Sequence, residues 1–239
     1  FFIVVIICIF LTGERSNFVK GTIIFFLIFI FLDSIFFALK KKYLFFLIII
    51  TFATSALIFK DIQERHLRFF GNIGIDLEGH VEPKIPESAS IYERFGRIRH
   101  FAHYEVALNI FKDFPLFGVG NSKFRFICHY EKYYNPKIIF TNERCSNHPH
   151  QVHLEILSEE GIVGYLIIVL TILHLLINSF IAYKKRKNII HLASIFFVII
   201  FFIPLLPSGS FFSTFNATIF WINLSLVNAF LNKAKHQVN

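Results

Sequence analysis

The polar segments of this sequence gather the side chains that a transfer reaction on a phosphate ester requires. The segments span residues 12–17, 94–120 and 145–151, and together they supply cations and imidazoles. An Arg guanidinium donates paired, charge-assisted hydrogen bonds to a diphosphate and keeps its charge near neutral pH. An imidazole takes a proton from a sugar hydroxyl near pH 7. The sequence therefore predicts a transfer in which arginines stabilise a leaving diphosphate and a histidine activates the attacking hydroxyl.

The elements that must position these side chains are predicted to be membrane helices. The chain is 55% hydrophobic and has a mean hydropathy of +0.59, which favours an integral membrane protein over a soluble domain. It contains no Met and opens inside an apolar stretch, so we expect a fragment whose first span is truncated. About 20 apolar residues cross a bilayer as a helix. The complete candidates are 21–39, 43–60, 162–183, 189–207 and 211–231, and the expected fold class is an all-α polytopic helical bundle.

Basic clusters orient these predicted spans. Residues 40–42 and 184–187 are Lys or Arg and lie in short loops, which the positive-inside rule places in the cytoplasm. The short loop 13–20 and the long segment 61–161 then face the periplasm, and 232–239 forms a cytoplasmic tail. The predicted organisation is membrane helices over 1–60, one large periplasmic loop domain over 61–161, and membrane helices again over 162–231. The net charge is +8, and basic residues cluster beside hydrophobic segments, where such clusters set membrane orientation. We therefore expect the lipid bilayer as a partner and no nucleic acid.

The large polar loop contains one predicted helix and one candidate disulfide. Residues 91–114 carry apolar side chains at helical spacing, which predicts an amphipathic helix. Pro115 is expected to end it, because proline disfavours helical geometry in the residue before it. Cys128 and Cys145 share this polar region. They are candidates for a disulfide, because the periplasm is an oxidising compartment.

Residues 13–17 (GERSN), 107–120 (ALNIFKDFPLFGVG) and 148–164 (HPHQVHLEILSEEGIVG) resemble successive signatures of the O-antigen ligase and polymerase family. Their order and spacing match over most of the chain. The resemblance implies a multi-helix, inverting, metal-independent glycosyltransferase in the bacterial inner membrane, with no cofactor and a site that faces the periplasm. The implied donor is a glycan on undecaprenyl diphosphate. The implied acceptor is lipid A core for a ligase, or a second lipid-linked glycan for a polymerase.

The resemblance also assigns catalytic residues. It places the catalytic His at His150 and the first essential Arg at Arg15. The second essential Arg of the family usually lies four residues before an aromatic residue. With Tyr104 as that aromatic residue, the position holds His100.

The neighbouring cations, Arg97 and Arg99, are therefore the candidates for the second Arg. On a continuous helix Arg97 shares a face with His100, whereas Arg99 lies beside His103. We expect Arg99 to be catalytic because it is closer in sequence, and we keep Arg97 as the alternative and as a substrate-binding residue.

Other residues near His150 are expected to bind substrate: His148, Gln151 and Glu155. Gln151 stands where the family normally has Asn, and it retains an amide. His148, His150 and His153 are also spaced closely enough to suggest a metal site, but no carboxylate or Cys spacing completes a familiar pattern, so no metal is expected.

Proteins of two other classes fit the sequence less well. A transporter places ionisable residues inside its spans, whereas the predicted spans hold few besides Asp33. A scaffold with a periplasmic loop needs neither Arg15 nor His150, so substitution of these residues separates a scaffold from an enzyme. Ligase and polymerase remain alternatives, because both handle the same lipid diphosphate and differ mainly in the acceptor.

Overall fold

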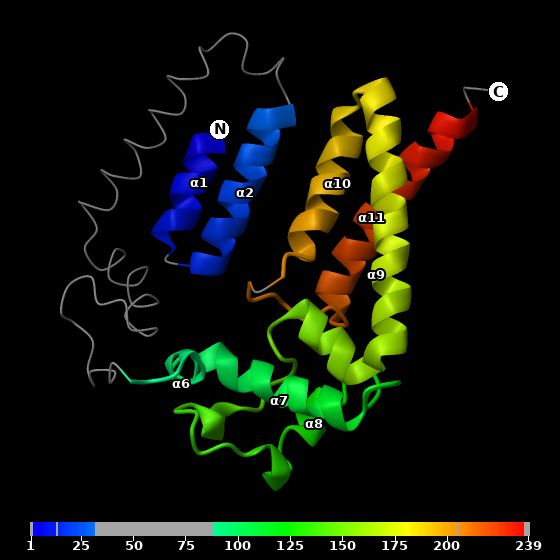
Figure 1. The fold of residues 1–239 in the computed structure, drawn as a ribbon. Helices are drawn as coiled ribbons and strands as arrows, with labels where there is room; N and C mark the ends of the chain where they lie inside the picture. Colours follow the sequence, from blue (N-terminus) through cyan, green and yellow to red (C-terminus); the bar gives the residue numbers. More distant parts are fainter. Residues whose placement is uncertain (1, 13, 32–87, 205, 237–239) are drawn as a thin grey trace. The chain divides into compact units, whose positions relative to one another are not determined.

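Long apolar runs separated by short polar turns give this chain helices as its regular elements. The computed structural model describes residues 2–12, 14–31, 88–204 and 206–236, and within them every regular element is helical (Figure 1). The expected all-α class is confirmed for this part of the chain. The predicted span 43–60, the end of the span 21–39, Gly13 and the first part of the large loop lie outside the described residues. The chain divides into two units, residues 1–95 and 96–239, and each is described by itself.

In the first unit, α1 (Phe2–Leu11) and α2 (Arg15–Phe31) pack against each other. Thr12 forms the turn between them. Its hydroxyl donates a hydrogen bond to the Ile9 carbonyl at 2.6 Å and accepts one from the Glu14 N–H at 3.3 Å. Helix ends leave backbone groups without partners inside the helix, and this side chain satisfies one group from each end.

The prediction of one helix over 91–114 is wrong, because the segment forms two helices. They are α6 (Ile91–Phe95) and α7 (Arg99–Asp113). Gly96 lies between them, and glycine is a poor residue for a helix interior. Ile98 has extended backbone angles, φ −91° and ψ 124°, which set the start of α7. The faces expected for a continuous helix therefore do not apply before Arg99.

In the second unit, α7 packs against α9 and against a compact polar layer. That layer contains α8 (Phe124–Ile127) and the 3-10 helices η1 (Glu131–Tyr133) and η2 (Thr141–Glu143). Their shared core is formed by Val106, Ala107, Ile110, Phe124, Cys128 and Tyr133. α7 ends two residues before Pro115, as predicted. Its last residue, Asp113, accepts hydrogen bonds from Lys132 Nζ at 2.7 Å and Tyr133 Oη at 2.8 Å, which fixes this end of the helix on the layer.

Apolar helices make up the rest of the second unit. α9 (Val152–Arg186), α10 (Ile189–Phe201) and α11 (Thr214–His236) pack against one another (Figure 1). Asn188 caps α10, because its side-chain oxygen accepts hydrogen bonds from the first free N–H groups of that helix. Aromatic rings fill the space between the end of α10 and the start of α11. The closest pair, Phe201 and Phe220, has ring centroids 4.9 Å apart.

One helix among the described residues, Val152–Lys185, is long and apolar enough to cross a membrane by length and composition. Ser16–Leu27 and Ile189–Phe201 are shorter apolar helices. Val152–Lys185 contains the predicted span 162–183, and Ile189–Phe201 is shorter than the predicted 189–207. Ser16–Leu27 overlaps the predicted 21–39 only at 21–27, and α11 is shifted from 211–231.

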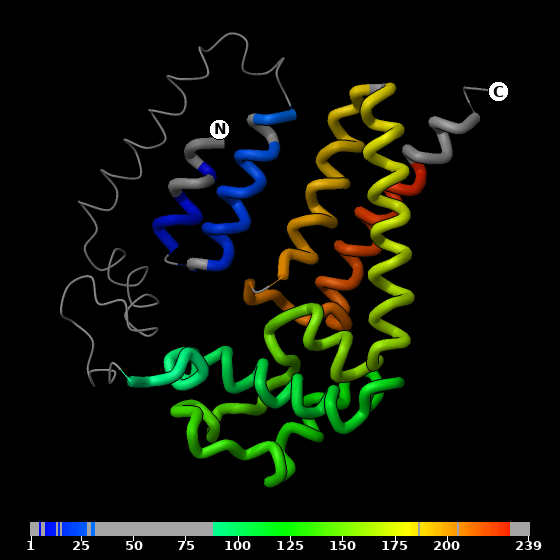
Figure 2. Tube along the Cα trace, viewed as in Figure 1, coloured from blue at the N-terminus to red at the C-terminus, as the bar shows by residue number. Residues whose placement is uncertain are grey.

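A break at Gly161 divides α9 into two parts. Gly161 has φ 65° and ψ −170°, which no helical residue has, and the chain changes direction there (Figure 2). The break frees the Ser158 and Glu159 carbonyls from the ordinary helix pattern. These carbonyls accept hydrogen bonds from the Val119 and Gly120 N–H groups, at 3.0 and 2.7 Å.

The segment 115–120 also accepts hydrogen bonds from the first N–H groups of the second part of α9. The Ile162 N–H donates to the Pro115 carbonyl at 2.8 Å, and the Val163 N–H donates to the Leu116 carbonyl at 3.2 Å. Residues 115–120 therefore replace the helical hydrogen bonds that the break removes. We call this set of contacts, between residues 115–120 and 158–163, the crossing.

Glycine is required on both sides of the crossing. A Cβ atom on Gly118 would lie 2.4 Å from the Glu159 carbonyl, and one on Gly161 would lie 2.4 Å from the Leu116 carbonyl. Both glycines also have positive φ angles, 62° and 65°. The glutamate at position 159 adds a side-chain contact, because its carboxylate accepts the Ser122 N–H at 2.6 Å and the Phe124 N–H at 3.0 Å.

Gly161→Ala is expected to destabilise the second unit strongly. The left-handed backbone costs about 1–3 kcal/mol for a residue with a Cβ, and forcing the two backbones apart adds about 1–3 kcal/mol. Thermal unfolding in detergent measures the change. Gly21→Ala is the control, because a Cβ there meets only the end of the Ile9 side chain at 3.3 Å. Equal unfolding temperatures for the two variants would contradict the role given to the crossing.

Candidate functional site

Four imidazoles meet at the face of α7 that lies against the turn before α9. We call His100, His103, His148 and His150 the histidine cluster. The ring centroid of His150 lies 5.0 Å from that of His100, 5.0 Å from that of His103 and 4.3 Å from that of His148. His100 also stacks on Tyr104, one helical turn further along α7, with centroids 6.4 Å apart. The ring of His150 is thus packed against three other imidazole rings.

α7 supplies two members of the cluster because positions three apart lie on one helix face. His103 is buried, and its Nδ1–H donates a hydrogen bond to the Arg144 carbonyl at 3.0 Å. This bond assigns the proton to Nδ1 and leaves the Nε2 lone pair of His103 available in the neutral ring.

Arg144 is a buried cation that holds the segment behind His103. Its guanidinium donates hydrogen bonds to the carbonyls of Cys128, Thr141 and His129, at 3.1, 3.3 and 3.2 Å. These bonds join the region of α8, η2 and the turn that leads to His148. The carbonyl that orients His103 is therefore fixed by the side chain of its own residue.

The turn at residues 146–151 places the other members of the cluster. The Ser146 hydroxyl donates to the His148 carbonyl and accepts the His148 N–H at 3.4 Å. His150 has a left-handed backbone with φ 57°, a conformation that costs free energy in a residue with a side chain. The Ser208 N–H supports this conformation by donating to the His150 carbonyl at 2.8 Å. Gln151 follows as the N-cap of α9, and its side-chain oxygen accepts the Leu154 N–H at 2.8 Å.

The connection between α10 and α11 supports this turn from the other side. The Ser208 carbonyl accepts a hydrogen bond from His148 Nε2 at 3.3 Å, while the Ser208 N–H bonds His150. Glu155 holds the connection in place, because its buried carboxylate accepts the Phe211 N–H at 2.7 Å and the Ser210 hydroxyl. Glu155 therefore acts on the histidine turn through residues 208–211.

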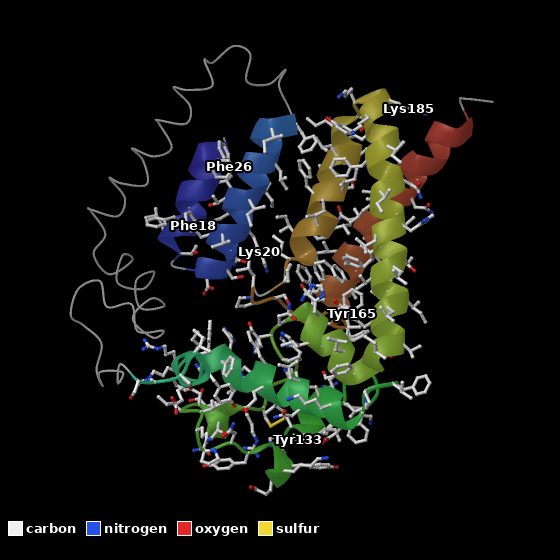
Figure 3. All side chains as sticks on the ribbon, in the orientation of Figure 1. Phe18, Lys20, Phe26, Tyr133, Tyr165 and Lys185 are labelled. Carbon is white, nitrogen blue, oxygen red and sulfur yellow. A yellow bond between two sulfur atoms is a disulfide. The ribbon has the colours of Figure 1, made fainter. Side chains whose placement is uncertain are left out.

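His153 lies outside the cluster and joins the two parts of α9. Its Nε2–H donates to the Phe202 carbonyl at 2.9 Å, and its Nδ1 accepts the Tyr165 hydroxyl at 3.1 Å. Tyr165 lies just beyond the break, far along α9 from Lys185 (Figure 3). The trio His148, His150 and His153 that the sequence suggested is therefore not brought together, and His100 and His103 take the place of His153.

Burial and mutual proximity favour the neutral form of the cluster. Burial, together with the neighbouring His148, lowers the pKa of His150 from 6.5 to about 4. Burial also lowers the pKa of His103 and of His148. Neutral imidazoles at pH 7 have a lone pair that can accept a proton or bind a metal ion.

The three arginines predicted for the site differ in their positions and in their exposure to solvent. Arg99 is the first residue of α7, is exposed, and forms an ion pair with Glu143 at 2.5 Å. It is close enough to His150 to contribute to the lowered pKa of that ring. Arg97 is half-buried in the turn before α7. Arg15 begins α2 in the first unit.

Several residues of this site were not predicted from the sequence. His100 and His103 were considered only as neighbours of the arginines, although their spacing of three on a predicted helix was a usable signal. Arg144 and Ser208 gave no such signal, because their contacts to Cys128 and His148 join positions far apart in the sequence.

Cys128 and Cys145 are joined by a disulfide, with Cα atoms 5.4 Å apart and a sequence separation of 17. Figure 3 shows the bond near Tyr133. The disulfide attaches the end of α8 to the segment that leads into the histidine turn.

Thiol counting is expected to detect this bond. The sequence has three cysteines, and Cys8 is free. Protein denatured without reductant should take up one maleimide–polyethylene glycol tag, and reduced protein should take up three. Cys8→Ser is the control and should take up none before reduction. Three tags on unreduced protein would contradict the disulfide.

Cys145→Ser is expected to lower the free energy of unfolding by about 3 kcal/mol, because the disulfide closes a loop that is free in the unfolded variant.

Acidification should protonate His150 only well below the ordinary range for histidine. Because its pKa in the folded protein is lowered to about 4 from 6.5, the stabilising effect of the neutral ring is complete above about pH 6.5. It is lost as the pH falls through about 4. Histidine-labelled NMR, with His150→Gln to assign the signal, gives the midpoint. His148→Gln removes one neighbouring imidazole and should raise that midpoint; a wild-type midpoint at 6.5 would disprove the effect.

Comparison with known families indicates the same family as the sequence motifs. The sequence profile of the family described as O-antigen ligase matches residues 1–169, well over half of the 239 residues. The matched region includes Arg15, α7 and the complete histidine cluster. No curated protein and no solved structure matches the chain. The chain belongs to the O-antigen ligase family.

Proposed function

We propose that this protein transfers a glycan from undecaprenyl diphosphate to lipid A core at the periplasmic face of the bacterial inner membrane. The observation that carries the proposal is the position of His150: a half-buried imidazole held in a left-handed turn, within a chain of the O-antigen ligase family. Strained backbone conformations at non-glycine residues gather at functional sites. Hydrogen bonds from the surrounding segments maintain this one.

His150 acts as the general base. Its ring nitrogen takes the proton from the acceptor hydroxyl, and the hydroxyl oxygen attacks the anomeric carbon of the donor sugar. The bond from that carbon to the diphosphate oxygen breaks as the new bond forms, so undecaprenyl diphosphate leaves with the electron pair. Direct displacement inverts the configuration of the anomeric carbon.

The lowered pKa of His150 in the protein alone suits this role once the donor binds. The ring is neutral at pH 7, so it can accept a proton. A diphosphate bound nearby brings negative charge, which favours the imidazolium and raises the pKa of the ring. The base therefore becomes stronger in the complex that needs it.

Arg15 holds the diphosphate, together with Arg99 or Arg97. Arg99 is exposed and is near His150, which supports it as the second cation; its ion pair with Glu143 must open for the diphosphate. Arg97 is half-buried and is the alternative. A guanidinium is suited to this contact because it binds phosphate oxygens in pairs.

The other predicted site residues act from inside the protein. Gln151 and Glu155 already bond the backbone of α9 and of the 208–211 segment, so we propose that they position His150. We propose that His148, by contrast, contacts the sugar; its half-buried position beside His150 supports this role.

The two ends of α9 support a proposal for how the chain lies in the membrane. Residues 162–185 form about 36 Å of helix at 1.5 Å per residue, which exceeds the bilayer hydrocarbon core of about 30 Å. The histidine cluster lies near the start of α9, and the exposed Lys184 and Lys185 lie near its end. We propose that the lysines remain in the cytoplasm, that residues 61–161 form a periplasmic loop domain and that further spans complete a polytopic bundle.

His150→Ala and Arg15→Ala are expected to abolish transfer in cells. Loss of a general base lowers a rate by about 10² to 10⁴, and loss of Arg15 removes charge from the leaving group. Blots of surface polysaccharide, with membrane levels of each variant measured, test this. Polymer that stays on the lipid carrier and is absent from lipid A core indicates a ligase. Single repeats on the core indicate a polymerase.

Matched controls separate catalysis from folding. His129→Ala removes an exposed histidine of the same loop, and Arg125→Ala removes an exposed arginine. Both controls should retain the surface glycan. A normal glycan pattern in His150→Ala, at normal membrane levels, would disprove the catalytic role and leave a transporter or scaffold as the reading to pursue.

A further inference from the structure

The histidine cluster contains a group of nitrogens close enough to bind one ion. His100, His103 and His150 each offer one ring nitrogen, and these nitrogens all lie within 4.8 Å of one another. Ligands 2.0–2.1 Å from a tetrahedral ion are about 3.3 Å apart. Binding would require small ring rotations of His100 and His150, which are half-buried rather than fully packed.

His103, the buried member of this group, is already oriented as metal-binding histidines usually are. A metal-bound His usually donates its other ring N–H to a carbonyl or carboxylate, which fixes the ring and the tautomer. His103 does this, because its Nδ1–H bonds the Arg144 carbonyl at 3.0 Å. Arg144 is itself held by bonds to the carbonyls of Cys128, Thr141 and His129. His103 Nε2 is thereby left as the ligand atom.

The donor set selects the class of ion. Imidazole nitrogens suit Zn²⁺, Cu²⁺ and Ni²⁺, whereas Mg²⁺ and Ca²⁺ require oxygen ligands. Three protein nitrogens leave one tetrahedral position for water or another ligand. A second group, Cys128, His129 and Cys145, lies nearby, but both of its sulfur atoms are used in the disulfide.

We propose that His100, His103 and His150 bind one divalent transition-metal ion of the Zn²⁺ class, and that this ion inhibits glycan transfer. The inhibition rests on the proposed function. A metal ion bound to the ring nitrogen of His150 occupies the lone pair that takes the proton from the acceptor hydroxyl. The reaction itself needs no metal in this scheme, so the ion is a regulator of the site.

Titration calorimetry with Zn²⁺ alone on the purified protein in detergent tests the site. We expect one saturable site per chain. His100→Gln and His103→Gln should each weaken binding at least about tenfold, as changes around metal sites do. His129→Gln is the matched control, because it removes an exposed histidine outside the group. Absence of saturable binding, or equal affinity in all four proteins, would overturn the metal site.

A transfer assay with and without Zn²⁺ tests the inhibition. The rate of each protein is divided by its own rate in chelator, so loss of basal activity in a variant does not affect the comparison. Wild type should lose half its rate near the Zn²⁺ concentration that half-fills the site, and His100→Gln should need at least about tenfold more. A full rate with the site filled, or a rate that depends on Zn²⁺, would overturn the inhibition. Neither result bears on whether His150→Ala abolishes transfer, which decides the proposed function separately.

Discussion

The crossing between residues 115–120 and 158–163 is the interaction on which the rest of the second unit depends. A helix that breaks leaves backbone N–H and C=O groups without partners, and in a protein interior each such group is costly. The turn after α7 supplies partners in both directions, from Val119 and Gly120 to one part of α9 and from Pro115 and Leu116 to the other. α7 is thereby tied to the helix that follows the histidine turn. The relative positions of His103 and His150, on separate elements, depend on this attachment.

Around the cluster, buried ionisable side chains position the backbone through hydrogen bonds. Arg144 holds three carbonyls, and Glu155 holds the 208–211 segment. The guanidinium of Arg144 is ionised, and hydrogen bonds that involve an ionised group are stronger than neutral ones and directional. Such bonds allow a loop-rich region to keep aromatic rings about 5 Å apart without a sheet or long helices behind each ring. The disulfide adds a covalent restraint to the same region. Positioning of this kind is what any reaction requires when its catalytic groups come from separate segments of a chain.

The sequence was sufficient for the family and for the helical class. The order of the motifs indicated His150 as the candidate base, which stays a prediction. Long apolar runs indicated α9, α10 and α11, because the length of such a run is a local signal. The break before α7 was missed because Gly96 and the extended Ile98 interrupt a pattern that is otherwise continuous. The cluster was missed for a different reason: His100 and His103 become close to His150 only when α7 packs on α9. No local pattern encodes the pairing of Ser208 with His148 across 60 positions.

The crossing also limits how this sequence can change. At Gly118 and at Gly161 the missing side chain leaves room for the other backbone, so neither position tolerates a methyl group while its partner segment stays in place. A substitution at one glycine needs a displacement of the facing segment, which carries its own backbone hydrogen bonds and the contacts of Glu159. The segments that contain Gly118 and Gly161 are separated by some forty residues of chain. Each therefore constrains the other, because a substitution in one segment requires a compensating change in the segment that faces it.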